Sequence, residues 1–255
     1  MALSYGAWLI ISGNGIYLAP ASAPFFLISA LAEIGFFVGM VRGYAVGDLS
    51  LVYPLARGFP PILVAIASAL LLNERLPWTG YAGIAIVVAG IFLVSLTANG
   101  AGKKFRARDL PDAFRHPATR WALLSGVFIA VYSLTDKIAL ENGTPPVVYN
   151  FWVFFGNLVG WMPFVWRRTR VQQNFDFIRG NLGGVLIGAA AIVATYFFVL
   201  TALAMTSASY VTAGRSLSVV VGALLGTLAL KEGFGIARMI GAALMVAGIA
   251  LMALA

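Results

Sequence analysis

Residues Arg57 to Leu96 read RGFPPILVAIASALLLNERLPWTGYAGIAIVVAGIFLVSL, and a diverged copy of this stretch lies later in the same chain. Moved forward by 158 positions, the stretch aligns without a gap with Arg215 to Leu254, and 13 of the 40 pairs are identical. Arg57 aligns with Arg215 and Glu74 with Glu232. An apolar composition does not by itself supply matching charged residues, so the alignment indicates an internal duplication.

The composition indicates a polytopic membrane protein. Hydrophobic residues make up 61% of the chain, charged residues make up 10%, and the mean hydropathy is +0.92. Apolar runs of about 20 residues, the length that crosses a bilayer as a helix, recur along the whole chain. Basic loops at the cytoplasmic membrane face account for the net charge of +8 without a nucleic-acid partner. The chain has no cysteine and one histidine, so we expect no metal site and no cofactor.

Hydropathy predicts an all-α fold with about nine transmembrane helices. The first span is weak because Gly13-Asn14-Gly15 interrupts it, and two polar segments, 98–118 and 167–181, read as connections. The spans are expected at about 3–18, 24–46, 48–72, 77–97, 119–140, 146–166, 182–204, 206–230 and 234–255.

The distribution of basic residues predicts the orientation of the spans. Of 17 Lys and Arg residues, 13 fall at span ends on one side, against Arg75 alone on the other. That side is expected to be cytoplasmic, at the inner (plasma) membrane, with the N-terminus inside and the C-terminus outside. The duplicated spans, the third and the eighth, are five apart and therefore cross in opposite directions. This pattern is an inverted-topology repeat, the usual construction of a secondary transporter.

The repeat plan divides the chain into three parts. Residues 1–97 form a first repeat of four helices, 98–118 a basic cytoplasmic linker, and 119–255 a second repeat of five helices. A five-helix unit therefore predicts that the first helix of the plan is lacking at the front of this chain.

Three ionisable residues are expected near the middle of the bilayer: Glu33, Arg57 and Arg215. A charge at that depth costs about 2.5–3.5 kcal/mol on insertion scales, so each must face a partner or a wet cavity. Glu33 and Arg57 lie at matching depth on consecutive antiparallel spans. They form either a structural ion pair or a substrate or proton site at the repeat interface.

Further candidates for substrate binding or coupling lie in the third, fifth and sixth spans. Snorkelling to the membrane interface is the simple explanation of Lys137. Asn157 shares a helix face with Asn150, near Trp161, where the two amides either line a path or bridge helices. The candidates are Tyr53, Tyr132, Asp136, Lys137 and Asn157.

A second group of residues is expected to be structural. Glu74 and Glu232 both lie where one helix ends and the next begins, and a negative charge stabilises a helix N-terminus. Pairs of glycines seven residues apart predict close helix packing, at Gly83, Gly90, Gly241 and Gly248.

Several stretches resemble the EamA family of the drug/metabolite transporter superfamily. They are GYAVGDLSLVYPL at 43–55, NER at 73–75, KE at 231–232 and the glycine-rich spans after those junctions. YSLTDK at 132–137 looks like the opening of that family's second repeat. The resemblance covers essentially the whole chain. It implies a ten-helix fold of two inverted repeats around a central cavity that passes small metabolites, often outward.

The sequence therefore favours a transmembrane transporter and not an enzyme. We expect a secondary efflux transporter that moves a small polar metabolite, such as an amino acid, by alternating access at a midplane cavity, with protons as the coupling ion. Counting Arg57, Arg215 and Lys137 against Glu33 and Asp136 favours a cargo that bears a carboxylate. The alternatives are a flippase for a lipid-linked or sugar-phosphate headgroup and a membrane partner that transports nothing.

Overall fold

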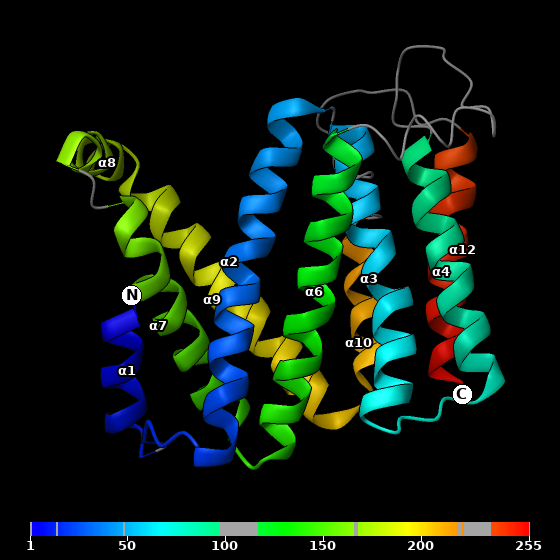
Figure 1. Cartoon of the computed structure of the whole chain (residues 1–255), viewed down its shortest axis with the longest axis horizontal. Helices are drawn as coiled ribbons and strands as arrows, with labels where there is room; N and C mark the ends of the chain where they lie inside the picture. The colour runs from blue at the N-terminus through cyan, green and yellow to red at the C-terminus, as the bar shows by residue number, and fades with distance from the viewer. Residues whose placement is uncertain are drawn as a thin grey trace. The chain divides into compact units, whose positions relative to one another are not determined.

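The computed structural model describes residues 2–13, 15–47, 49–96, 117–165, 168–218, 221 and 236–254 of the 255-residue chain. All the elements in this part of the chain are helices, shown in Figure 1. The α-helices are α1 (Ala2–Ile11), α2 (Ala23–Val46), α3 (Leu49–Leu71), α4 (Trp78–Leu96), α6 (Pro117–Glu141), α7 (Pro146–Val165), α8 (Arg168–Gly180), α9 (Leu182–Met205), α10 (Ala208–Arg215) and α12 (Ile236–Ala253). A short 3₁₀ turn, Pro20–Ser22, leads into α2.

Hydropathy confirms the membrane character of the described helices. Three of them are long and apolar enough to cross a bilayer: Pro20–Val46, Pro117–Glu141 and Leu182–Met205. Shorter apolar helices occur at Ala56–Leu71, Trp78–Leu93 and Met239–Ala253. The predicted all-α class is confirmed, and the observed helices begin and end close to most of the predicted spans.

One expectation about the spans was wrong. The first span, predicted over 3–18, is a helix of only 10 residues that ends at Ile11, and such a helix is about 15 Å long. Gly13 and Gly15 follow it with φ of 78° and 68°, a backbone conformation that stops a right-handed helix. The polar segment 167–181 leads into the seventh span as expected, and it contains the 13-residue helix α8.

The chain folds as two compact units that do not follow the sequence repeats. Unit 1 consists of Met1–Ile34 and Thr135–Thr206, and unit 2 of Gly35–Leu134 and Ser207–Ala255. Each unit therefore takes segments from both halves of the chain. The predicted division into repeats at 97 and 119 stays a prediction.

The core of unit 2 is the packing of α12 against α4, which lie side by side in Figure 1. A Cβ atom added at Gly83 would lie 2.7 Å from the carbonyl oxygen of Gly248, and one added at Gly90 would lie 2.6 Å from that of Gly241. The two backbones therefore touch directly, as they do where small residues line membrane helices. Val87 and Met245 fill the space between the two glycine contacts.

A second glycine row joins α2 to α6 within unit 2. Gly39 and Gly43 lie on one face of α2, and Gly47 directly follows the last residue of that helix at the same spacing of four. A Cβ atom at these positions would meet, respectively, Ser125, Val52 together with Trp121, and Ala118. In unit 1, α7 packs against α9 and α1, and Gly156 of α7 admits Phe26 of α2 in the same way.

We predict that Gly248→Val destabilises the protein by about 1–3 kcal/mol, the usual cost of overpacking a tight contact. The added Cβ atom would lie 2.6 Å from the carbonyl oxygen of Gly83 and 2.9 Å from the backbone nitrogen of Val87, neither of which can rotate away. Gly188→Val is the matched control, because nothing lies within 4 Å of a Cβ atom there. Thermal unfolding in detergent measures both variants. Equal loss of stability in the two would show that the close contact contributes nothing.

Candidate substrate and coupling site

The best-defined polar cluster of unit 1 surrounds the fully buried carboxylate of Asp136 on α6. Its Oδ1 accepts hydrogen bonds from the hydroxyl of Ser29 on α2, at 2.5 Å, and from that of Tyr149 on α7, at 3.1 Å. Its Oδ2 accepts one from the hydroxyl of Tyr196 on α9, at 2.6 Å. One carboxylate therefore joins four helices.

Three hydroxyl donors match the hydrogen-bonding needs of an ionised carboxylate, which only accepts. Hydrogen bonds to a charged acceptor are about twice as strong as those between neutral groups. An unsatisfied charge inside a membrane protein is costly, and the hydroxyl cage removes that cost at Asp136. The geometry therefore gives Asp136 a structural role, and a direct part in substrate binding or coupling stays a prediction.

The sequence analysis missed the three hydroxyls, although two spacings point to them. Ser29 precedes Glu33 by one helical turn, and Tyr149 precedes Asn157 by about two turns. Polar residues at such spacings lie on one face of an apolar helix and predict a polar seam. No spacing within one helix predicts Tyr196, which is 60 residues from Asp136.

Glu33 and Asn157, both predicted site residues, lie together in this seam. The side-chain amide of Asn157 on α7 donates to Oε2 of Glu33 on α2, at 2.5 Å. The same nitrogen also donates to the carbonyl of Val153, one turn earlier in its own helix. Glu33 is a buried acidic residue in the long apolar helix α2. The amide thus holds a buried carboxylate in place between two helices.

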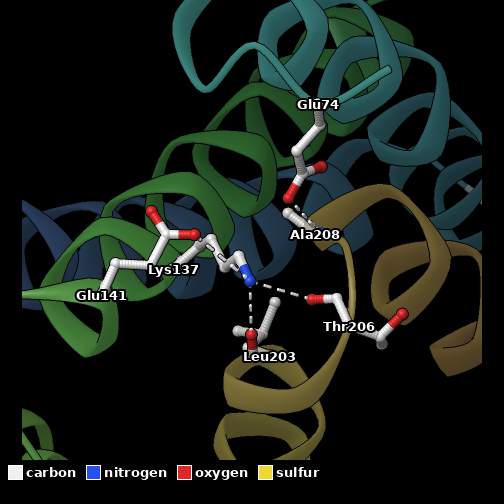
Figure 2. A network of polar contacts seen from close by, with 6 residues as sticks. All are labelled: Glu74, Lys137, Glu141, Leu203, Thr206 and Ala208. Carbon is white, nitrogen blue, oxygen red and sulfur yellow. Dashed lines mark hydrogen bonds and ion pairs between the residues drawn. The ribbon is translucent and has the colours of Figure 1, made fainter. Parts of the chain in front are cut away.

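Lys137 is buried and caps the C-terminal end of α9, and its part in substrate binding or coupling stays a prediction. Its ammonium donates to the carbonyls of Leu203, at 2.9 Å, and Thr206, at 3.0 Å (Figure 2). It also lies 3.3 Å from the carboxylate of Glu141, one turn later on α6. The last carbonyls of a helix lack partners within it and carry partial negative charge, so a cation there is stabilising.

Asn150, expected either to line a path or to bridge helices, bridges helices. Its side-chain nitrogen donates to the carbonyl of Val193 on α9, at 3.2 Å, and lies 3.4 Å from the hydroxyl of Tyr5 on α1. Trp161, nearer the other end of α7, stacks edge-on against Phe164. Asn150 and Asn157 thus contact different neighbours.

Unit 2 brings together two other predicted site residues, Arg215 and Tyr132. The guanidinium of Arg215, at the end of α10, donates to the hydroxyl of Tyr132 on α6 at 3.0 Å. It also lies over the tyrosine ring, with 5.4 Å between its central carbon and the ring centroid, a cation–π geometry. Phe36 of α2 packs edge-on against the same ring. The planar guanidinium group matches the two oxygens of a carboxylate, so an arginine on an aromatic ring is a candidate for binding such an anion.

The remaining predicted site residues lie on α3. Arg57 is half-buried within the helix. The side chain of Tyr53 lies outside what the structure describes. Glu33 and Arg57 belong to different units, so their pairing stays a prediction.

Of the two glutamates predicted to be structural, the structure describes only one. The carboxylate of Glu74 accepts a hydrogen bond from the backbone N–H of Ala208, the first residue of α10, at 3.1 Å (Figure 2). Glu74 was expected to place its negative charge at a helix N-terminus, and the helix N-terminus that it contacts is that of α10. Glu232 lies outside the described residues. Across the described ranges, no group of three or more His, Asp or Glu side chains could hold a metal ion.

Comparison with known proteins gives a family and a fold. The model of the EamA-like transporter family matches residues 117–254. No curated protein matches the chain. A chain of known structure, described only as the crystal structure of a protein, is similar to this chain at 19% identity with a TM-score of 0.70, covering 98% of this chain and 84% of its own. At that identity the likeness supports the fold alone, which is the predicted all-helical membrane fold.

We predict that Tyr196→Phe destabilises the protein by about 1.5–3 kcal/mol, the usual worth of a hydrogen bond to a charged group. The change deletes the donor to Oδ2 of Asp136 but keeps the ring that packs against Phe154. Thermal unfolding in detergent measures the loss. Tyr17→Phe is the control, because Tyr17 is exposed and should change nothing. An unchanged Tyr196→Phe protein would contradict the structural role of the cage.

We predict that Lys137→Met lowers stability by on the order of 2 kcal/mol, because two carbonyls at the end of α9 lose their partner. Glu141→Gln removes only the exposed partner of the ion pair, and such pairs contribute about 0–1 kcal/mol. The comparison is made by thermal unfolding of both variants. A larger loss in Glu141→Gln than in Lys137→Met would assign the lysine to the ion pair.

Proposed function

Because the chain belongs to the EamA-like transporter family, we propose that it is a secondary transporter for a small polar metabolite, such as an amino acid. The family is one of transporters and not of enzymes. The observation that carries the finer proposal is a set of ionisable side chains of both signs, buried or half-buried within apolar helices: Glu33, Arg57, Asp136, Lys137 and Arg215. Each is expensive in a membrane and marks a candidate substrate or ion path.

The contacts of two of these residues hold helices together. The oxygens of Asp136 accept hydrogen bonds from the hydroxyl cage, and the ammonium group of Lys137 donates to two carbonyls of α9 and lies beside Glu141. The supported role of both is to hold the helices that carry the site.

Glu33, Arg57 and Arg215 are the proposed binding and coupling residues, because each is an ionisable side chain that is buried or half-buried in the protein. In unit 2, a guanidinium group such as that of Arg215 suits a cargo that bears a carboxylate, because it binds a carboxylate through two parallel hydrogen bonds. Glu33 is the proposed proton carrier, since a carboxylate in a low-dielectric site binds a proton or a cation in turn.

Alternating access between the two repeats is the proposed mechanism. The reciprocal glycine contacts support it: Gly83 meets Gly248 and Gly90 meets Gly241, although the alignment equates Gly83 with Gly241. Two copies related by a two-fold axis make contacts of this crossed kind. The orientation, with the basic segments in the cytoplasm, follows from the charge bias of the sequence and belongs to the proposal. Export is the direction that the resemblance to the family implies, and it belongs to the proposal as well.

We predict that the purified protein in proteoliposomes moves an amino acid from a metabolite panel, and that a pH gradient increases the flux. Glu33→Gln should remove the dependence on the gradient, because a neutral amide cannot carry a proton. Arg75→Ala is the control, since Arg75 is exposed and basic but lies outside the proposed site. Full proton-coupled flux in the Glu33→Gln variant would contradict the proposed role of Glu33 in proton coupling. A panel that yields neither flux nor a thermal shift would favour a membrane partner that transports nothing.

We predict that Arg215→Gln raises the KM for a carboxylate-bearing substrate by about ten- to a hundredfold, the worth of a hydrogen bond to a charged group. Tyr132→Phe keeps the ring below the guanidinium and removes only one acceptor, so its effect should be smaller. Initial-rate flux against substrate concentration separates KM from the maximal rate. An unchanged KM in Arg215→Gln would remove Arg215 from the binding site.

A further inference from the structure

Helix α8 joins the end of α7 to the start of α9 and lies within unit 1. Its contacts with these two helices are few compared with those that α7 and α9 make with each other. Figure 1 shows α8 at the end of α7 and α9, turned away from the direction in which they run. Because α9 is long and apolar enough to cross a bilayer, α8 lies where the spanning part of unit 1 ends.

Three large apolar side chains of α8 are exposed. The exposed fraction is 61% for Phe175, 64% for Phe177 and 41% for Ile178. Val171, Phe175 and Ile178 follow one another at spacings of four and three, which places them on one face of the helix. Only Val171 of this apolar stripe is half-buried against the protein. Gln173 lies opposite this stripe, with Asp176 and Phe177 on either side of it. A stripe of this size in contact with water would be unfavourable.

The charge of α8 is predominantly positive. The helix contains Arg168, Arg170 and Arg179 against a single acidic residue, Asp176. Arg167 directly precedes it in the sequence. At 100° per residue, Arg179 lies next to Phe175 at the border of the apolar stripe. A helix with an apolar stripe bordered by arginine has the pattern of a helix that lies in the plane of a membrane surface.

We propose that α8 lies in the interface of the bilayer, with its apolar stripe between the acyl chains and its arginines on anionic lipid headgroups. The occupant of the exposed face is thus a lipid surface with negative charge. Charge complementarity selects it, because basic residues near a membrane surface are attracted to anionic lipids. The position of α8 at the end of a spanning helix brings the stripe to the depth at which acyl chains meet headgroups. This surface is distinct from the proposed site on α2, α3 and α10.

The absence of cysteine in the sequence makes the proposal directly measurable with single-cysteine variants. Phe175→Cys and Ile178→Cys lie on the stripe, and Gln173→Cys and Asp176→Cys lie on the exposed polar face. Each full-length variant is spin-labelled and reconstituted into vesicles made of equal parts phosphatidylcholine and phosphatidylglycerol. Collision rates are measured with oxygen, which concentrates in lipid, and with a water-soluble nickel complex.

We expect the ratio of oxygen to nickel collisions to be several-fold higher at 175 and 178 than at 173 and 176. Equal ratios at all four positions would mean that α8 stands in water and would overturn the proposal. Low collision rates with both reagents at 175 and 178 would mean that protein covers the stripe, which overturns it equally. A single symmetric gel-filtration peak in detergent confirms that each variant is folded before it is labelled.

A second measurement tests the anionic part of the proposal. A fluorophore at Ile178→Cys is quenched by nitroxide headgroup-labelled phosphatidylglycerol or, separately, by phosphatidylcholine labelled in the same way. Quenching by the anionic lipid should be several-fold stronger, and Arg168→Gln with Arg179→Gln should abolish the difference. Equal quenching by the two lipids in the parent variant would refute a preference for anionic headgroups.

Discussion

The high free energy of an unpartnered polar group in the bilayer is the constraint on which this structure depends. Asp136 and Lys137 satisfy it in opposite ways although they are adjacent on α6. The carboxylate collects hydroxyls from three other helices, and the ammonium collects carbonyls from the end of α9. Successive residues of a helix point about 100° apart, so the adjacent residues Asp136 and Lys137 of α6 contact different neighbouring groups. The same constraint is why the charges of Glu33 and Arg215 are associated with an amide and an aromatic hydroxyl.

Close backbone contact is the second means of holding the helices, because lipid tails offer no hydrophobic drive for helix association. The duplication allowed the glycines of α4 and α12 to be predicted as packing residues, and the contacts at Gly83 and Gly248 confirm that they are. The inverted repeat also predicts that the two helices run in opposite directions, and an antiparallel pair joins residues from opposite ends. The contacts of Gly83 with Gly248 and of Gly90 with Gly241 agree with that direction. The axial register that brings these particular glycines together could not be predicted, because it depends on how the side chains of the two helices pack.

The helices themselves were largely predictable, since a hydropathy window needs only local sequence, and α2, α6 and α9 lie where it placed them. The cage around Asp136 was not. The spacing of Ser29 to Glu33 indicates a polar face but not its partner, which is 107 residues away. Tyr196 is 60 residues from Asp136, and nothing local distinguishes it from the other tyrosines. The helix α8 was not predicted, for a different reason. A window of about 20 residues averages its arginines with its phenylalanines, whereas a test for a 3.6-residue period detects Val171, Phe175 and Ile178 as one face.

The connection between α9 and α10 shows how the same constraint is met at two helix ends. Lys137 caps the C-terminus of α9, and Glu74 with Ser207 caps the N-terminus of α10, so each helix end carries the charge or acceptor that complements its dipole. Between the caps, Thr206 has an extended backbone, with φ of −145° and ψ of 178°. Two capped ends resist fraying, so the chain passes from α9 to α10 within Thr206 and Ser207. The contacts of Lys137 and Glu74 therefore fix where the two helices end, and this structural role explains both charges without a contact to substrate.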